Sequence, residues 1–207
     1  MQYDPREHKK HNRQSIRLRG YDYSLAGFYF ITICVNERRS LFGDVVEGKM
    51  QLSVGGKKLY RAWNSIPSRL PATGTDCFVV MPNHVHGIIA LTDRPIGCGI
   101  APQVSSGAPV CTNGVTLPEI VRWFKAATTN MYRAAIRRRG WPRYEKRLWQ
   151  RNYYEHIIRD AESLSRIREY ISTNPERWSM DCENPDCVAK DPFDMWFETT
   201  FSAPDNA

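Results

Sequence analysis

Apolar residues recur along this chain at two spacings, and each spacing predicts a different kind of secondary structure. The aromatic and β-branched run over residues 28–35 predicts a buried strand. Shorter apolar runs predict further strands, and the one near residues 45–52 is either a second strand or a hairpin. These further strands are expected over residues 45–52, 77–81, 84–91 and 153–158.

Apolar residues three and four positions apart predict helices, and particular residues mark where the helices begin and end. Pro118 suits the first turn of a long helix, and Gly140 stops that helix. Asp160 can cap the next helix, which ends at Asn174 because Pro175 follows it. The expected helices span residues 57–68, 117–139 and 161–173.

The order of these elements predicts an α+β fold. Strands follow one another over short connections and alternate with only a few helices, which is not the pattern of a doubly wound sheet. We therefore expect a sandwich in which helices pack on one face of a mainly antiparallel sheet. A chain of 207 residues is expected to hold one domain, over residues 25–180, between a basic arm (1–24) and an acidic tail (181–207).

The formal net charge of the chain is +7, and its distribution matters more than its size. Residues 122–151 contain ten Lys or Arg and one acid, whereas residues 181–207 contain seven acids and one base. A basic block of this kind suits a nucleic acid backbone, although a solvated helix face with an acidic tail for solubility is the alternative. Exposed rings among these bases could stack on unpaired nucleotides. The residues expected to contact DNA are Arg122, Lys125, Arg133, Arg137, Arg138, Arg143, Lys146, Arg147, Arg151 and Trp149.

Other features of the sequence indicate where in the cell the protein is expected. No run reaches the roughly 18 to 20 apolar residues that cross a bilayer, and the charged N-terminus lacks the apolar segment of a signal peptide. The protein is therefore expected in the cytoplasm, at the nucleoid, with its six cysteines reduced. Cys182 and Cys187 could bind zinc, but the usual close Cys/His pair is absent. Residues 94–114 are rich in Pro, Gly, Ser and Thr and are expected to form a mobile loop.

The segment Pro82-Asn-His-Val-His carries the most specific chemistry of the chain. Because side chains of a strand alternate between its faces, His84 and His86 point to one side and Val85 to the other. Two neutral imidazoles on one face can hold a divalent metal if a third ligand approaches from another element. The alternative is a purely structural pair of histidines.

The last expected helix offers partners for such a metal. Tyr170 and Asn174 are four residues apart, so they project from one face of the helix. The side-chain oxygen of Asn is an acceptable ligand for Mg²⁺ or Mn²⁺. A metal on a scissile phosphate would stabilise developing charge, and the Tyr170 hydroxyl could attack phosphorus to form a covalent phosphotyrosine that a free DNA hydroxyl reverses. Each residue alone has an ordinary structural explanation, and only the combination with a basic helix favours function.

These segments together resemble one known family. The motif at residues 82–86 is similar to the HUH signature of single-tyrosine transposases, in which a bulky residue separates two histidines. The most specific part of the resemblance is the ordered set that ends in Tyr-x-x-x-Asn-Pro. The segments that resemble the REP-associated tyrosine transposases are residues 15–23, 27–35 with Arg38 and Arg39, 149–159 and 168–175, and the likeness spans about residues 15–178.

The resemblance carries implications for fold, site and substrate. It implies a ferredoxin-like α+β sandwich with a central, mainly antiparallel sheet. It implies His84 and His86 as metal ligands and Tyr170 as the nucleophile. Asn174 matches the position of the third ligand, where relatives in other insertion sequences carry Gln. The implied substrate is single-stranded DNA with palindromic repeat hairpins, cleaved with Mg²⁺ or Mn²⁺ to leave a 5′-phosphotyrosine.

The sequence leaves several alternatives open. Tyr153 or Tyr154 could be the nucleophile, although strand alternation places Tyr154 with His156 on one face and Tyr153 on the other. The chain could be a hairpin-binding module without catalysis, or a zinc hydrolase that needs a carboxylate beside the histidines, for which the spacing offers no obvious candidate. The acidic tail could compete with DNA for the basic surface. A monomer and a homodimer are both compatible with the sequence.

Overall fold

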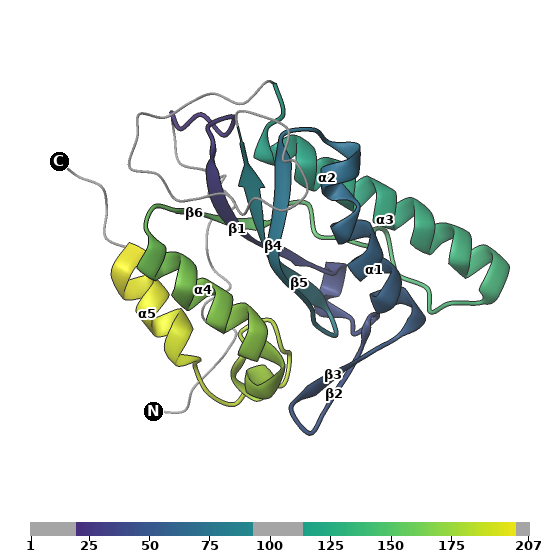
Figure 1. Cartoon of the computed structure of the whole chain (residues 1–207). Helices are drawn as coiled ribbons and strands as arrows, with labels where there is room; N and C mark the ends of the chain where they lie inside the picture. Colours follow the sequence, from purple (N-terminus) through teal and green to yellow (C-terminus); the bar gives the residue numbers. More distant parts are fainter. Residues whose placement is uncertain (1–19, 93–113, 202–207) are drawn as a thin grey trace.

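The computed structural model of the chain describes residues 20–92 and 114–201. Most of the expected arm (1–24) and nearly all of the expected loop (94–114) lie outside the described residues. Four strands form one antiparallel sheet in the order β4-β5-β1-β6, and helices lie on both of its faces (Figure 1). These strands are β1 (Gly27–Cys34), β4 (Thr73–Val80), β5 (His84–Leu91) and β6 (Tyr154–Ile158).

The connections between these strands are those of a ferredoxin-like sandwich. The chain runs β1-α1-β4-β5-α3-β6, and this order combined with the observed sheet order is the βαββαβ arrangement. The expected α+β class and the mainly antiparallel sheet are therefore confirmed. The other elements are η2 (Asn36–Arg38), β2 (Gly43–Val46), β3 (Lys49–Leu52), α1 (Val54–Asn64), α2 (Ile66–Arg69), α3 (Leu117–Arg139), α4 (Ala161–Thr173), η3 (Asn174–Met180) and α5 (Pro192–Phe201).

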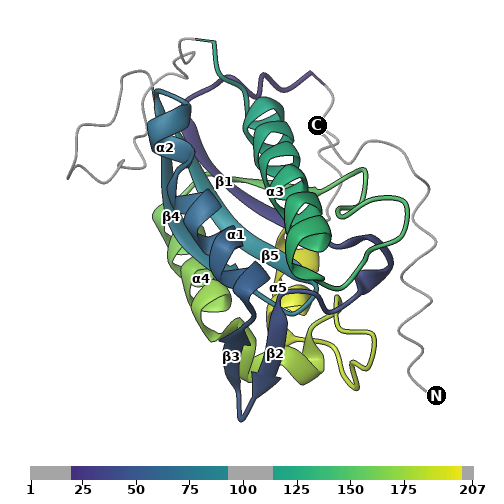
Figure 2. The same ribbon diagram turned by 90° about the vertical axis from the view of Figure 1, so that its right-hand side faces the viewer.

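Strand β1 is apolar on both faces, and this decides where the helices pack. Tyr29, Ile31 and Ile33 lie in a core that includes residues of α1 and α3, which lie side by side over this face (Figure 2). Phe28 and Phe30 lie in a second core with residues of α4. The expectation that helices pack on one face is wrong, because a sheet with two apolar faces must be covered on both.

The two longest helices have the bounds expected from the sequence, because their ends are set by local side chains. Thr116 precedes α3, and its backbone N–H donates to the Glu119 carboxylate at 3.0 Å in a capping box. Gly140 ends α3 in the left-handed conformation, with a φ of 63°. Asp160 caps α4 by accepting a hydrogen bond from a backbone N–H of its first turn. None of the helices in the described part of the chain has the length and apolar content that crossing a membrane requires.

The helix expected over residues 57–68 is instead two helices, α1 and α2. Helix α1 begins earlier, because the Ser53 hydroxyl accepts a hydrogen bond from the Gly56 N–H at 3.2 Å. Gly56 packs against the preceding hairpin, and a Cβ there would lie 2.9 Å from the Leu52 side chain. The sequence pattern marked the apolar stripe of this region but not the cap before it.

Gly87 lets β5 pack closely against α1, which leads to a test of the core. A Cβ on Gly87 would lie 2.5 Å from Trp63 Cζ2 and 2.9 Å from Phe78 Cδ2. We expect Gly87→Ala to lower the free energy of unfolding by about 1 to 3 kcal/mol, as overpacking does. The matched control is Gly27→Ala, whose Cβ meets no atom nearer than 3.9 Å. Urea unfolding followed by circular dichroism would contradict the account if both variants lost the same stability.

Candidate functional site

The two histidines of β5 project from one face of the sheet, toward α4. In the register of the sheet, His84 lies opposite Cys34 of β1 and His86 lies opposite Thr32. Both imidazoles are buried, with exposed fractions of 0% for His84 and 3% for His86. Their neighbour Val85 faces the opposite core, as strand alternation predicts.

Hydrogen bonds to the two Nδ1 atoms fix the orientation of the imidazoles. His84 Nδ1 lies 2.8 Å from the side-chain oxygen of Asn83, which can only accept, so Nδ1 carries the proton and Nε2 keeps its lone pair. His86 Nδ1 lies 2.8 Å from the Thr32 hydroxyl. The two Nε2 atoms converge to 2.9 Å. Burial lowers the pKa of His84 to about 3, so its ring is neutral, the form that binds metals.

Asp181 brings a carboxylate to the same point from the far end of the chain. Its Oδ2 lies 3.4 Å from His84 Nε2 and 3.9 Å from His86 Nε2, and the residue is 2% exposed. Burial raises the pKa of Asp181, but the imidazoles and the Glu183 N–H outweigh burial and hold the pKa below its usual value. The structure therefore supplies a carboxylate beside the histidines, for which the sequence spacing offered no obvious candidate.

A set of hydrogen bonds holds the Asp181 segment against the β4–β5 turn. The Asn83 amide donates to the carbonyl oxygens of Arg38 at 3.1 Å and of Glu183 at 2.8 Å. The Arg38 guanidinium in turn donates to the Cys182 carbonyl at 2.6 Å and pairs with the Glu183 carboxylate at 2.9 Å. Asn83 thus orients His84 and positions the segment that carries Asp181. No sequence spacing could have indicated these partners, because they come from three separate parts of the chain.

Tyr170 of α4 lies beside the imidazole pair. Its hydroxyl lies 3.3 Å from His86 Nε2. Its ring stacks on Phe193 at a centroid distance of 3.9 Å, and the residue is 4% exposed. Burial, followed by the nearby carboxylate of Asp181, raises the pKa of Tyr170 well above its usual value. The geometry brings Tyr170 together with His84 and His86, while the role of Tyr170 as a nucleophile stays a prediction.

Asn174, the other expected ligand from this region, is the first residue of η3. It is 0% exposed, and neither its amide nitrogen nor its amide oxygen has a hydrogen-bond partner. A buried amide with both groups unpaired is costly, and a bound ligand would satisfy it. Its role as a metal ligand stays a prediction.

The alternative tyrosines make other contacts. Tyr154 shares a face with His156, as strand alternation predicts, and its ring contacts Phe30 and Phe197. His156 also packs against Phe197, and burial lowers its pKa to about 4. Tyr153 packs against the core of the opposite face. Tyr170 is therefore the tyrosine for which the described residues show a hydrogen bond to the histidine pair.

Helix α3 carries half of the expected DNA-binding residues, and it lies on the face of the sheet opposite to α4 (Figure 1). Two of the expected residues, Lys125 and Trp149, bind groups within the protein instead. The Lys125 ammonium donates to three successive carbonyls, those of residues 150–152, and burial lowers its pKa to about 8. Trp149 is 4% exposed, and its indole N–H donates to Thr128 at 2.9 Å, so its ring packs in the core. The exposed members are Arg122, Arg133, Arg137, Arg138, Arg143, Lys146 and Arg151, and Arg147 is half-buried.

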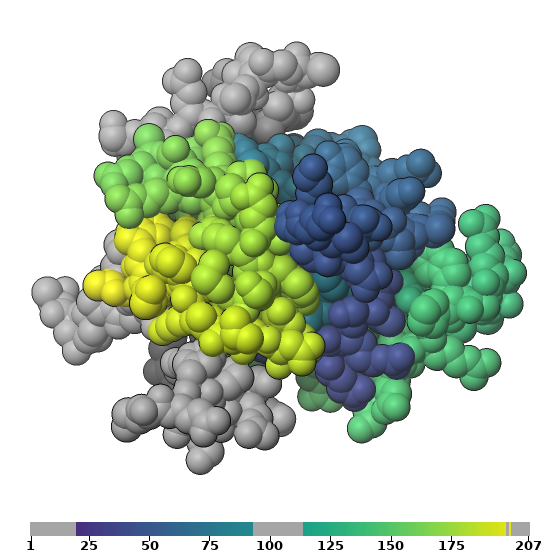
Figure 3. Space-filling model, turned by 90° about the horizontal axis from the view of Figure 1, so that it is seen from below, coloured from purple at the N-terminus to yellow at the C-terminus, as the bar shows by residue number. Residues whose placement is uncertain are grey.

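The residues expected to form an acidic tail instead pack over the site, up to the end of α5. Figure 3 shows this segment (yellow) on the lower face of the molecule, beside η3 and α4. Phe193 stacks on Tyr170, and Phe197 contacts Phe30 of β1. Together with Asp181, these contacts leave the imidazoles and the phenol nearly unexposed. A substrate can reach the site only if part of this segment moves.

The residues present fit a divalent metal. His84, His86 and Asp181 each offer one ligand atom, and these atoms all lie within 4.8 Å of one another. In the described residues, Asp181 Oδ2 is buried and accepts no hydrogen bond, as expected of an oxygen that awaits a ligand. Two imidazoles and one carboxylate suit Mn²⁺ and other first-row ions.

Two comparisons with known proteins find similarity to REP-associated tyrosine transposases. The chain is 42% identical over 176 residues to an uncharacterized protein of Haemophilus influenzae, covering 83% of this chain and 92% of the relative. It is 25% identical over 155 residues to a candidate REP-associated tyrosine transposase of the same organism, covering 74% of this chain and 73% of the relative. A solved REP-associated tyrosine transposase bound to a REP hairpin matches the fold with a TM-score of 0.52 at 19% identity, over 79% of this chain and 74% of that one. No protein-family model matches the chain.

The low pKa of His84 predicts a loss of stability in mild acid. In the metal-free protein the pKa is about 3, against about 6.5 in the unfolded chain. Between these values only the unfolded state binds the proton, so the contribution of His84 to stability falls as the pH drops below 6.5. From pH 7.5 to 5.0 the loss is about 2 kcal/mol for this residue.

Urea unfolding in the presence of a chelator checks this expectation. The variant His84→Gln lacks the titration, so it should lose about 2 kcal/mol less than the wild type over the same pH interval. Equal losses in the two proteins would show that His84 does not stay neutral when buried.

Proposed function

Because the chain belongs to the family of the REP-associated tyrosine transposases, we propose that it cleaves and rejoins single-stranded DNA through a covalent 5′-phosphotyrosine. The observation that carries this proposal is the 3.3 Å distance between the Tyr170 hydroxyl and His86 Nε2, within a site that also contains His84 and Asp181. A nucleophile and a metal site within reach of one another are what this chemistry requires.

Tyr170 and the metal-binding residues have separate roles in the proposed reaction. Tyr170 gives up its phenolic proton to water and attacks the scissile phosphorus, so that a bond forms between the phenolic oxygen and phosphorus. The bond between phosphorus and the 3′ oxygen breaks, and this oxygen takes up a proton to become a free 3′ hydroxyl. The reverse attack by a 3′ hydroxyl regenerates Tyr170 and rejoins the strand. Mg²⁺ or Mn²⁺, held by His84, His86 and Asp181 with Asn174 as a further ligand, would withdraw charge from the phosphate.

Burial explains why the reaction needs an opened site. The raised pKa of Tyr170 keeps the phenol protonated while Phe193 and the Asp181 segment cover it. Contact with water and with the positive charge of the loaded site lowers the cost of the phenolate. The site lies within one chain, since Tyr170 and His86 belong to the same molecule, and this supports a monomer as the active form over an exchanged homodimer.

The proposed substrate is a hairpin formed by a palindromic repeat. The solved relative is bound to a REP hairpin, and this chain has an exposed row of basic residues on α3 and after it. We propose that these bases hold the duplex part of the hairpin by its phosphates, with an affinity that falls as salt rises. The strand to be cut then passes to the opposite face of the sheet.

The first test concerns the metal ligands. We expect Asp181→Ala to lower the affinity for Mn²⁺ by at least about tenfold, and Asn174→Ala to lower it by less, because a carboxylate contributes charge and an amide does not. Mn²⁺ binding measured by electron paramagnetic resonance gives the comparison. The control is Asp44→Ala on the exposed surface of β2, which should leave the affinity unchanged. An Asp181→Ala protein that binds Mn²⁺ as tightly as the wild type would remove Asp181 from the ligand set.

The second test concerns the covalent intermediate. With Mn²⁺ and labelled hairpin DNA, the wild type should form an adduct that survives denaturing electrophoresis. Tyr170→Phe should bind the DNA with unchanged affinity and form no adduct, because it lacks the attacking oxygen. Tyr154→Phe is the matched control and should form the adduct. Adduct in Tyr170→Phe would assign another nucleophile.

A metal-dependent hydrolase is the second candidate, because Asp181 supplies the carboxylate that this function needs. Here a metal-activated water would cut the DNA, and Tyr170 would be a neighbour of the site only. The same assay separates the two functions, since Tyr170→Phe would then still cut the DNA and no protein would form an adduct. Binding without any cleavage would leave a hairpin-binding module.

A further inference from the structure

Three acidic side chains of the segment 181–191 each lie against a group on the active-site face, and two of them form ion pairs. Asp181 lies 3.4 Å from His84 Nε2. Glu183 pairs with Arg38 at 2.9 Å, and Asp191 pairs with Arg177 at 3.0 Å. The segment therefore lays a row of carboxylates over the imidazoles and over two guanidinium groups.

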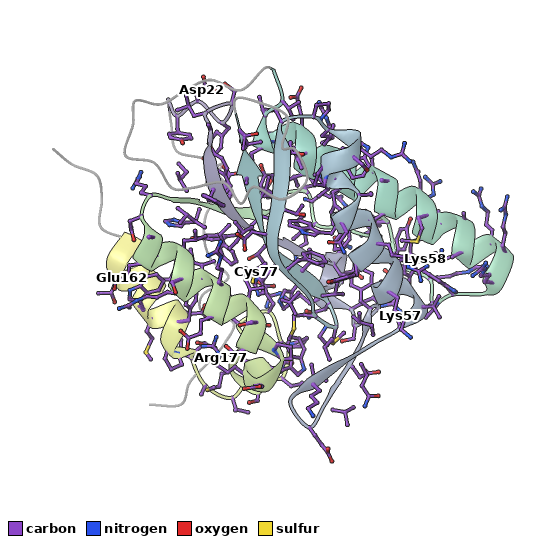
Figure 4. The ribbon with its side chains drawn as sticks, viewed as in Figure 1. Asp22, Lys57, Lys58, Cys77, Glu162 and Arg177 are labelled. Carbon is purple, nitrogen blue, oxygen red and sulfur yellow. The ribbon has the colours of Figure 1, made fainter. Side chains whose placement is uncertain are left out.

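Arg177 is close to the proposed nucleophile. The centre of its guanidinium lies 5.2 Å from the centre of the Tyr170 ring, and it donates to the Tyr170 carbonyl at 3.4 Å. Arg177 lies within η3, and Figure 4 shows it near the end of α4. Its side chain is 24% exposed, and its Nε has no hydrogen-bond partner. One donor of this guanidinium is thus still free to bind an oxygen.

Arg38 occupies the other side of the histidine turn. It precedes β2, and its carbonyl oxygen is tied to Asn83, the residue before His84. Its backbone and that of Glu37 lie in the left-handed region, with φ values of 52° and 61°. Non-glycine residues held there cost energy and tend to occur at functional sites. The fold therefore holds the backbone of Arg38 in a conformation that costs energy.

We propose that Arg38 and Arg177 are phosphate-binding residues of the active site, and that the carboxylates of Glu183 and Asp191 occupy them until a DNA strand takes their place. Carboxylate and phosphate oxygens bind a guanidinium through the same geometry. The strand that reaches Tyr170 must displace the covering segment, and it leaves no guanidinium unpaired if its own phosphates replace the carboxylates. Arg38 and Arg177 then hold the phosphates on either side of the scissile one.

This inference rests on the proposed function, and it differs from competition at the basic surface of α3. In the structure the acidic groups face the site rather than α3, which lies across the sheet. The basic residues of α3 would hold the hairpin, whereas Arg38 and Arg177 would hold the single strand at the point of cleavage. The phosphates of the single strand would therefore lie where the carboxylates of Glu183 and Asp191 now lie.

The test measures binding without cleavage. The probe is a fluorescein-labelled single strand of thymidine only, which offers phosphates but no hairpin, and its affinity is measured by fluorescence anisotropy with a chelator present. Asp191→Asn removes the charge while the side-chain oxygen can still cap α5 by accepting from the Phe193 N–H, now 2.7 Å away. We expect this variant to bind the strand roughly three- to tenfold more tightly, because Arg177 becomes available to a phosphate.

A second set of variants tests whether the tighter binding depends on Arg177. Adding Arg177→Gln to Asp191→Asn should abolish the gain and lower the salt dependence of binding by about 0.7 in log–log slope, the value for one phosphate on a single strand. The pair Glu183→Gln and Arg38→Gln should behave in the same way, so the test survives if one variant fails to fold. The matched control is the pair Glu162–Arg166, also 2.9 Å apart but near the other end of α4 (Figure 4).

Each outcome decides the inference. Glu162→Gln should change the affinity little, and a gain equal to that of Asp191→Asn would mean that only net charge matters, which overturns the assignment. Folded Asp191→Asn and Glu183→Gln proteins with unchanged affinity would also overturn it. Failure of the proposed function is separate, since that would appear as absence of the wild-type adduct with Mn²⁺ whatever the anisotropy shows.

Discussion

The two-residue period of β5 is the constraint on which the site depends. Because β5 is buried on both sides, each of its faces must be filled, and His84 and His86 fill part of the face that α4 covers. Two imidazoles in an apolar core are tolerated only if their polar groups are paired, and Asn83 and Thr32 provide partners for the two Nδ1 atoms. The packing that stabilises the second core therefore also brings Tyr170 to the imidazoles.

Asn83 extends this constraint to the rest of the chain. One side chain accepts from His84 and donates to the carbonyls of Arg38 and Glu183, so the β4–β5 turn, η2 and the C-terminal segment meet at a single amide. A displacement of the C-terminal segment would break part of this set while leaving the imidazoles attached to their strand. The site thus has two parts. His84, His86 and Tyr170 are held by the sheet and α4, whereas the acidic residues of the C-terminal segment can give up their contacts to a substrate.

The sequence predicted the parts that follow from local periodicity. The strand that carries His84 and His86, the bounds of α3 and α4, and the common grouping with Tyr170 all follow from spacing and from caps such as Asp160. Asp181 could not be found in this way, because its position depends on contacts with distant residues, and its surroundings in the sequence indicated only an acidic tail. Trp149 was assigned to the DNA surface because bases surround it, but its indole has a buried partner. Composition cannot distinguish a ring that stacks on DNA from one that packs in a core.

The central claim is that a phenol and a pair of imidazoles share one reaction site, and the most direct measurement identifies the modified side chain. After reaction with Mn²⁺ and hairpin DNA, the adduct is digested with nuclease and protease, and the residual nucleotide is located by tandem mass spectrometry. We expect a nucleotide joined through its 5′ phosphate to Tyr170. A nucleotide on Tyr153, Tyr154 or any other residue would contradict it.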